Sequence, residues 1–235
     1  MNSPYTQKLI EKSIVYFDKA AETWDNKRRW NSYYKKKTAD YCSAMIPKNA
    51  SILEVGCATG ELLSKLVTKN GMGIDISRKM IEKTKEKFPH FRTIQGDIQT
   101  ISLNEKFDII VMSDLTDSLA DTWQAFRNIK TICHPHTRII LTYRNHFWAP
   151  LFRVAEFFRL KTKQPIQNWF SPSDLQEILE LNDFEIIQHG RFLLVPVYIP
   201  VMSNLINKFI APLPFISLFC FSRYLIGRHR EPPRA

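Results

Sequence analysis

The chain has 235 residues, of which 44% are hydrophobic, so it can bury one substantial core and is expected to form a single domain over residues 1–235. Its formal net charge of +10 favours an anionic partner, and nucleic acid or an anionic membrane would both fit. Four scattered cysteines without a Cys-x-x-Cys pair argue against a disulfide framework and a zinc site, and residues 1–18 lack the apolar core of a signal peptide, so a cytoplasmic protein is expected.

Residues 1–45 are expected to form an N-terminal helical arm, with two helical pieces that break near Asp25 and Asn26. Aromatic side chains have large burial energies, so packing of this arm onto the core is the simpler interpretation. A lid over a ligand site is the alternative. The arm is dense in aromatic residues, namely Tyr16, Phe17, Trp24, Trp30, Tyr33 and Tyr34.

From Ser51 onward, apolar strand patterns alternate with helical ones, which predicts a parallel sheet with right-handed crossovers. Ligands of such sheets bind beyond the carboxyl ends of the strands. The expected elements are strand 51–55, helix 60–69, strand 71–75, helix 78–88, strand 91–95, strand 107–112, helix 117–132 and strand 138–143.

The turn after the first strand, within Ile-Leu-Glu-Val-Gly-Cys-Ala-Thr-Gly at 52–60, is the most informative stretch of the chain. A dinucleotide fingerprint fails at its sixth position, Glu61, and no Lys-Ser/Thr pair follows Gly60 to make a phosphate loop. Glu54 would also repel a pyrophosphate. A carboxylate here suits a positively charged ligand such as S-adenosylmethionine, whose ribose hydroxyls would find an acid about 20 residues further on, at Asp75.

Four motifs in this order resemble those of the class I S-adenosylmethionine-dependent methyltransferases. They are Leu53 to Gly60, Gly73 to Ser77, Gln95 to Ile98 and Phe107 to Val111. Ala58 departs from the pattern, because the family commonly has a glycine there, and this mild change is expected to preserve binding. The resemblance covers residues 31–145 well and implies a Rossmann-like α/β fold with a seven-stranded sheet in the order 3-2-1-4-5-7-6. Strand seven would be antiparallel, and residues 46–145 would form the cofactor-binding core.

The resemblance also assigns site roles to residues at the strand ends. Glu54 would lie near the donor's amino group, Asp75 would accept from the ribose hydroxyls, and Asp97 would accept from the adenine amino group. No metal is expected. The full set of predicted cofactor-binding residues is Glu54, Gly56, Ala58, Gly60, Asp75, Ile76, Asp97, Ile98 and Ser113.

After strand five, residues 146–170 form an apolar insertion whose helix, 150–160, has only a narrow polar side. The helix is expected either to be buried or to lie in a membrane interface. His146 is the first candidate for a catalytic base, because it follows strand five on the ligand side and titrates in the useful range. Tyr143, Asn145 and Trp169 are predicted to shape the acceptor pocket.

The C-terminal part is expected to contain a capped helix from Ser171 to Leu181, strand six at 184–195 and strand seven at 222–228. A second apolar insertion, 196–215, lies between these strands. The tract 192–226 is too interrupted by prolines, asparagines and Lys208 for a membrane span, which needs about 20 apolar residues. An interfacial or lipid-receiving element is therefore predicted, and an extra hydrophobic lobe over the core is the alternative.

Together these features predict a methyltransferase that uses S-adenosylmethionine on a hydrophobic or lipid-linked acceptor, with O-methylation favoured and a possible peripheral location on an anionic membrane. A soluble small-molecule acceptor is one alternative, and an inactive methyltransferase-like binding or adaptor protein is another. A nucleic-acid substrate is disfavoured, because Ser113-Asp114-Leu115-Thr116 lacks the Asn/Asp-Pro-Pro-aromatic signature of amino-directed base methylases. The sequence leaves the oligomeric state open.

Overall fold

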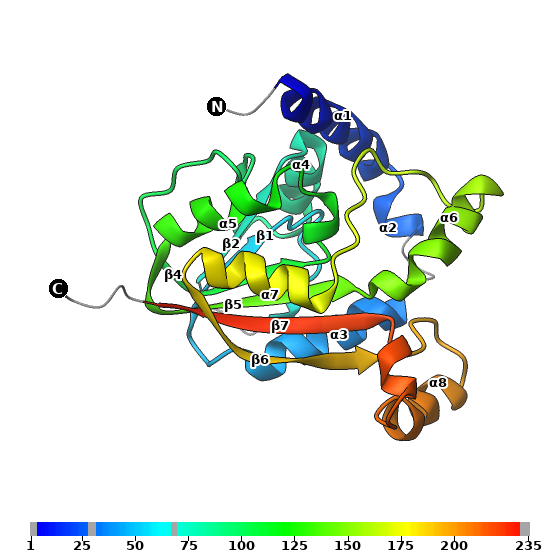
Figure 1. Ribbon diagram of the computed structural model, residues 1–235. Helices are drawn as coiled ribbons and strands as arrows, with labels where there is room; N and C mark the ends of the chain where they lie inside the picture. Colours follow the sequence, from blue (N-terminus) through cyan, green and yellow to red (C-terminus); the bar gives the residue numbers. More distant parts are fainter. Residues whose placement is uncertain (1–3, 28–31, 67–69, 231–235) are drawn as a thin grey trace.

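The computed structural model describes residues 4–27, 32–66 and 70–230. Seven strands form one sheet in the order β3-β2-β1-β4-β5-β7-β6, which confirms the predicted topology (Figure 1). Strands β1 to β5 pair in parallel, whereas β7 runs antiparallel to both β5 and β6. The strands are β1 (Ser51–Val55), β2 (Asn70–Asp75), β3 (Arg92–Gln95), β4 (Phe107–Ser113), β5 (Cys133–Arg144), β6 (Phe184–Leu193) and β7 (Ser222–His229).

Helices cover both faces of the sheet (Figure 1). Side chains alternate between the faces along each strand, so that Leu53 packs in one cluster with α5 and α7 while Ile52 packs in another with α3. The core is therefore two apolar layers on one sheet. The α-helices are α1 (Pro4–Ala21), α2 (Trp24–Lys27), α3 (Ser32–Met45), α4 (Arg78–Lys87), α5 (Thr122–Thr131), α6 (Ala149–Phe157), α7 (Pro172–Leu181) and α8 (Met202–Leu205).

The N-terminal arm is helical, as predicted, but the break expected near Asp25 and Asn26 is wrong, because both residues lie inside α2. The described break falls between α1 and α2, at residues 22–23. Trp30 lies outside the described residues. The predicted cap of α7 is also confirmed: Ser171 and Asp174 form a reciprocal capping box, with a proline at the first helical position.

Two predicted helices were wrong in extent. The helix expected at 60–69 is reduced to a single 3-10 turn, Leu63–Lys65, and residues 67–69 lie outside the described residues. The N–H of Leu63 donates to the carboxylate of Glu54 (2.9 Å), and the turn ends where the backbone becomes extended at Leu66. The helix expected at 117–132 begins at Thr122, where the side chain of Asp121 caps it, and the preceding turn Thr116–Ser118 is a separate 3-10 element.

The segment between β6 and β7 contains no strand pairing in the described structure. It holds α8, a π-helical turn at Ile206–Ile210 and a 3-10 turn at Ile216–Phe219. Among the described residues, no helix has the length and apolar character to cross a membrane.

Candidate functional site

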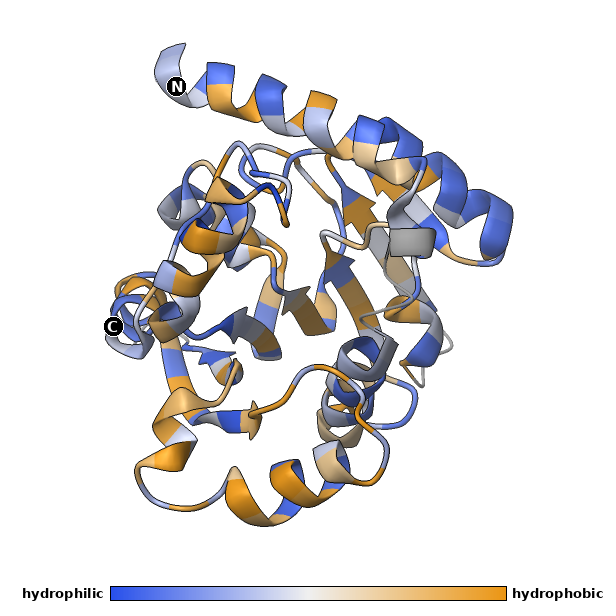
Figure 2. Ribbon diagram, turned by 90° about the vertical axis from the view of Figure 1, so that its right-hand side faces the viewer, coloured by the Kyte–Doolittle hydropathy of each residue, from blue (hydrophilic) through white to orange (hydrophobic). Residues whose placement is uncertain are grey.

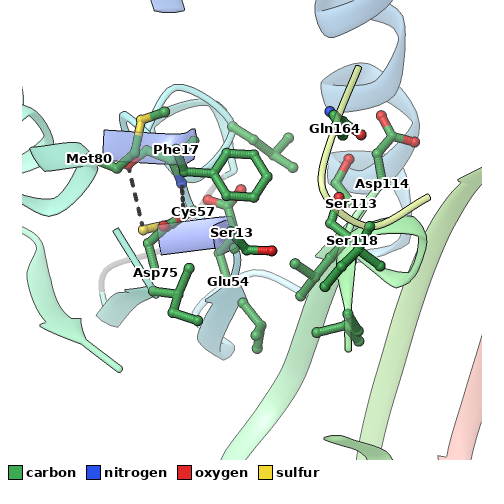
Figure 3. Close-up of a pocket in the computed structure, with 18 of the residues that line it drawn as sticks. Ser13, Phe17, Glu54, Cys57, Asp75, Met80, Ser113, Asp114, Ser118 and Gln164 are labelled. Carbon is green, nitrogen blue, oxygen red and sulfur yellow. Dashed lines mark hydrogen bonds between the residues drawn. The ribbon is translucent and has the colours of Figure 1, made fainter. Parts of the chain in front are cut away.

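A cavity of about 720 Å³ lies at the carboxyl ends of β1, β2 and β4 (Figure 3). In the close-up, Glu54 and Asp75 lie on one side, and Ser113, Asp114 and Gln164 lie on the other. Residues of α1 and α2 also line it, among them Ser13, Phe17 and Trp24, so the arm covers the cavity as well as packing on the core. The cavity is where a doubly wound sheet binds its ligand.

The turn from β1 brings the backbone to the cavity in a left-handed conformation. Gly56 has φ of 76°, and its N–H donates to the carbonyl of Ile74 (2.7 Å). The positive φ favours glycine at 56, and a Cβ there would also lie 2.8 Å from Cδ1 of Leu115, so that this flexible side chain would have to shift. Gly60 has φ of 74°, and a Cβ there would meet Thr84 at 2.6 Å. Gly60 therefore shapes the turn without lining the cavity.

Ala58 occupies a position where alanine is conformationally strained. Its φ is 48°, in the left-handed region that costs a residue with a Cβ about 1–2 kcal/mol. Two hydrogen bonds hold it there: its N–H donates to Asp75 (2.8 Å), and its carbonyl accepts from the hydroxyl of Thr84 (2.8 Å). The departure from glycine is thus accommodated by neighbouring side chains.

Asp75 links the turn after β1 to the start of α4. One carboxylate oxygen accepts from the N–H of Ala58 and the other from the N–H of Ser77 (2.9 Å). Ser77 in turn caps α4 and donates its hydroxyl to Asp18 of α1 (2.6 Å). These bonds fix the buried carboxylate of Asp75 at the cavity wall.

The other predicted cofactor residues also border the cavity. Glu54 is 3% exposed and accepts from Leu63, while Asp97 accepts from the backbone and side chain of Gln99 (both 2.9 Å). The hydroxyl of Ser113 pairs with that of Thr142 (2.9 Å). The structure therefore gathers the following predicted residues around one space: Glu54, Gly56, Ala58, Asp75, Ile76, Asp97, Ile98 and Ser113.

The residues predicted for the acceptor side lie elsewhere. Tyr143 is 2% exposed within the core, and Asn145 is fully buried, where its amide donates to the carbonyls of Leu218 (2.6 Å) and Cys220 (2.9 Å). Both side chains are buried in the interior of the protein, and neither lines the cavity.

Trp169 and His146 also lie outside the wall. The ring of Trp169 lies beneath the Arg144 guanidinium (5.4 Å) and against Phe152, so it supports wall residues from behind. His146 packs on Phe147, and burial followed by the nearby Arg223 charge lowers its pKa. The end of β5 turns this histidine away from the space that the strand-end acids share.

A polar network on the far wall was missed by sequence reasoning. The hydroxyl of Tyr34 donates to Asp114 (2.6 Å), and burial raises the pKa of Tyr34 well above its usual range. Arg144 donates to Asp117 (2.7 Å), and burial raises the pKa of Asp117 to about 6 against the lowering effect of the arginine. Tyr34, Asp114 and Arg144 line the cavity. Only the fold brings α3, β4 and β5 together, so no local pattern announces this network.

Beyond this network the wall is mainly apolar, with Lys161 and Gln164 as polar members. Leu151, Phe152 and Ala155 of α6 border the cavity together with Pro196 and Phe221, which come from the second insertion and its end. The rings of Phe152 and Phe221 stack at 6.1 Å. The cavity thus has an acidic end at the sheet and an apolar end beneath the two insertions.

The arm is tied to the acidic end by side-chain bonds. Asp25 accepts from the hydroxyl of Thr59 (2.9 Å) and pairs with Lys87, and Lys35 pairs with Glu61. These bonds add polar attachment to the apolar packing of α3 in the core. No group of three or more His, Cys, Asp or Glu side chains that could hold a metal ion occurs within the described ranges.

The residues at the acidic end fit S-adenosylmethionine. Gly56 lines the cavity without a side chain, so a ligand can approach its backbone closely. Asp75 offers carboxylate oxygens for ribose hydroxyls, and Glu54 offers negative charge for an ammonium or sulfonium group. A pyrophosphate would meet carboxylates from both strand ends and would be repelled.

Comparisons with known proteins agree with this chemistry. A family model described as a methyltransferase domain matches residues 27–189. Nodulation protein S of Bradyrhizobium diazoefficiens is 34% identical over 100 residues, which are 39% of this chain and 47% of that protein. Ubiquinone biosynthesis O-methyltransferase of Coxiella burnetii is 25% identical over 201 residues, 76% of this chain and 83% of that protein.

The fold is also similar to solved structures. The N-methyltransferase NodS of Bradyrhizobium japonicum WM9, in complex with S-adenosyl-L-homocysteine, has a TM-score of 0.67 at 16% identity and covers 94% of this chain and 100% of its own. At this identity the likeness concerns the fold alone. The chain spans about half the length of several curated relatives that it matches.

Proposed function

The chain belongs to the class I S-adenosylmethionine-dependent methyltransferases, and we propose that it transfers a methyl group to a hydrophobic or lipid-linked acceptor. The observation that carries the proposal is the continuity of one cavity between the acidic strand ends and the apolar wall of Phe152 and Phe221. A polar donor and an apolar acceptor can then meet within a single space.

At the acidic end, Asp75 and Asp97 would hold the donor's ribose and adenine, and Glu54 would lie near its amino group. When bound, S-adenosylmethionine supplies an electrophilic methyl group on a sulfonium. The chain's main contribution is alignment, which can account for about 7–11 kcal/mol of barrier reduction. The arm residues Ser13 and Phe17 line the same space and would exclude water from it.

For transfer to a hydroxyl, the acceptor must lose a proton, and we assign Asp114 as the group that receives it. Asp114 lines the cavity at the end of β4 and is fixed by the hydroxyl of Tyr34 (2.6 Å). Because the raised pKa of Tyr34 keeps that phenol protonated, it acts as a hydrogen-bond donor that orients the carboxylate. Asp114 replaces His146 in this role, since His146 does not border the cavity.

Two features support an apolar acceptor. The wall beyond Asp114 is formed by Leu151, Phe152, Ala155 and Phe221, whose side chains offer little hydrogen bonding to a polar substrate. The curated relative from Coxiella burnetii is named for ubiquinone biosynthesis. The proposal includes a cytoplasmic location.

The proposal is tested by incubating the protein with isotope-labelled S-adenosylmethionine and separate lipid and polar extracts, followed by untargeted mass spectrometry. We expect a transferred label in the lipid extract, absent with Asp75→Ala. Label only in the polar extract would instead support the soluble small-molecule acceptor. Donor binding without transferred label in either extract would contradict the proposed methyl transfer. This result would favour the inactive adaptor alternative.

A further inference from the structure

Exposed hydrophobic side chains gather on two segments of the chain. Six of the large ones lie within residues 147–160, twelve lie within 197–219, and six are scattered over the rest of the described residues. Phe157 and Leu160 are each 82% exposed, and Phe215 is 81% exposed. We call the exposed hydrophobic side chains of 147–160 and 197–219 the apolar face. A contiguous patch of this kind marks an interaction site more often than ordinary surface does.

The two segments are joined into one face. The indole N–H of Trp148 donates to the carbonyl of Phe219 (3.0 Å), and the rings of Phe147 and Phe219 lie 6.0 Å apart. Buried Asn145 fixes the same junction through its bonds to the backbone at 218 and 220. In Figure 1 both α6 and α8 lie on the right-hand side of the molecule. Figure 2 looks onto that side, with hydrophobic residues concentrated in the helical segment at the bottom.

The charges of this region have one predominant sign. Residues 190–221 contain no acidic residue, and residues 145–166 contain only Glu156, which pairs with Lys161 (2.7 Å). Arg153, Arg159 and Lys208 are exposed among the hydrophobic side chains. Basic side chains beside inserted apolar ones are the combination that attracts a protein to anionic lipid headgroups.

The apolar face also borders the cavity. Leu151 is 55% exposed on the face and lines the cavity at the same time, and Phe152 on the next position faces inward. Pro196 and Phe221 flank the 197–219 segment and line the cavity as well. A surface that covered this face would therefore lie directly over the apolar end of the site.

We propose that the apolar face docks on an anionic phospholipid bilayer, with Phe157, Leu160 and Phe215 inserted at the headgroup level. The direction of docking, with the apolar end of the cavity toward the lipid, rests on the proposed function, whereas docking itself does not. The depth of such insertion is about 5–10 Å, which fits a protein without a spanning helix among its described residues. The exposed basic residues would contact the headgroups around the inserted side chains.

Vesicle flotation tests the docking directly. The probes are vesicles of phosphatidylcholine alone and of phosphatidylcholine mixed with phosphatidylglycerol. The variant is Phe157→Glu with Leu160→Glu, and the matched control is Tyr5→Glu with Val15→Glu, which places the same two charges at exposed hydrophobic positions of α1. We expect the wild type and the control to float with the anionic vesicles and the face variant to lose about tenfold in binding.

A second measurement separates docking from donor binding. Titration with S-adenosylhomocysteine is expected to give the same affinity for the wild type, the face variant and the control, because all four positions lie outside the cavity wall. The docking proposal is overturned if the wild type does not float, or if the face variant floats like the wild type. It is also overturned if sedimentation shows a dimer that only the face variant disrupts, since a second copy would then cover the face. Absent donor binding would instead count against the proposed function.

Discussion

The two ends of the cavity are built on opposite principles. At the acidic end, the carboxylates of Asp75 and Glu54 accept from backbone N–H groups, so their positions are set by the turn that they hold together. At the apolar end, Leu151 and Phe152 come from a helix that exposes most of its hydrophobic side chains. The side chains of the acidic end are thus held in place before a ligand binds. The apolar end borders an exposed hydrophobic surface, so its environment depends on the partner that covers this surface.

The largest effect should come from the junction of the two ends. Asp114→Asn preserves an oxygen that can accept from Tyr34 but removes the proton-accepting carboxylate. We expect kcat to fall by about 10²- to 10⁴-fold with a hydroxyl acceptor, with donor affinity unchanged. Rates are to be measured with the acceptor identified by label transfer. Asp108→Asn, at the other end of β4, is the matched control, and an unchanged kcat in Asp114→Asn would remove this residue from the mechanism.

Within the acidic end, Asp75→Ala should weaken S-adenosylhomocysteine binding by about 100-fold, because both the ligand and two backbone N–H groups lose their acceptor. Calorimetric titration measures this. Glu82→Ala removes an exposed carboxylate of the neighbouring helix and should leave the affinity as it is. Equal affinities for the two variants would show that the acidic end does not hold the donor as assigned.

Gly56→Ala tests the steric requirement of the same end. The new Cβ would be strained by the positive φ and would contact Leu115 at 2.8 Å, so we expect a loss of about 1–3 kcal/mol in the free energy of unfolding and weaker donor binding. Chemical denaturation measures the stability. Adding Leu115→Ala should recover the part due to contact, and a fully stable Gly56→Ala protein would contradict the geometry of the turn.

The pH dependence of the free energy of unfolding tests the buried pair of Asp117 and Arg144 separately from the acidic end. Burial raises the pKa of Asp117 to about 6, so between about pH 4 and pH 6 the folded state holds a proton that the unfolded state has lost. The stability contributed by this group is therefore present below about pH 4 and is lost as the pH rises through 6.

The measurement is the difference in free energy of unfolding between the wild type and Asp117→Asn across this range. We expect that difference to fall by about 1–3 kcal/mol from pH 4 to pH 7. A difference that rises with pH would mean that attraction to Arg144 outweighs burial.

The smallest effect is expected for Ala58→Gly. Glycine adopts the φ of 48° without a Cβ penalty, so this substitution should stabilise the protein by about 0.5–1 kcal/mol. Thermal and chemical denaturation provide the check. Destabilisation would show that the methyl group of Ala58 contributes packing that exceeds the strain.

The acidic end was predictable because its residues lie at fixed places along the chain. Parallel strands place their carboxyl ends at one edge, so Glu54, Asp75 and Asp97 could be assigned to one site from spacing alone. The sheet order followed from the family resemblance and is confirmed. The shortened helix after Gly60 could not be foreseen, because the local pattern of helix-forming residues does not mark the extended backbone at Leu66.

The far wall was harder to predict, because its contacts join distant segments. His146 follows β5 at the expected end of the sheet, yet its ring packs on Phe147 and does not line the cavity. Tyr34 and Asp114 are 80 residues apart and meet only in the fold. Sequence patterns give the end of the sheet at which a residue lies, whereas the direction of its side chain requires tertiary contacts.

The central claim is that the acidic end binds the methyl donor while the apolar end is independent of it. Calorimetric titration of the wild type with S-adenosylmethionine tests this most directly. The account predicts one site per chain with a dissociation constant in the micromolar range, retained in Phe157→Glu with Leu160→Glu. A wild type that shows no binding would contradict it.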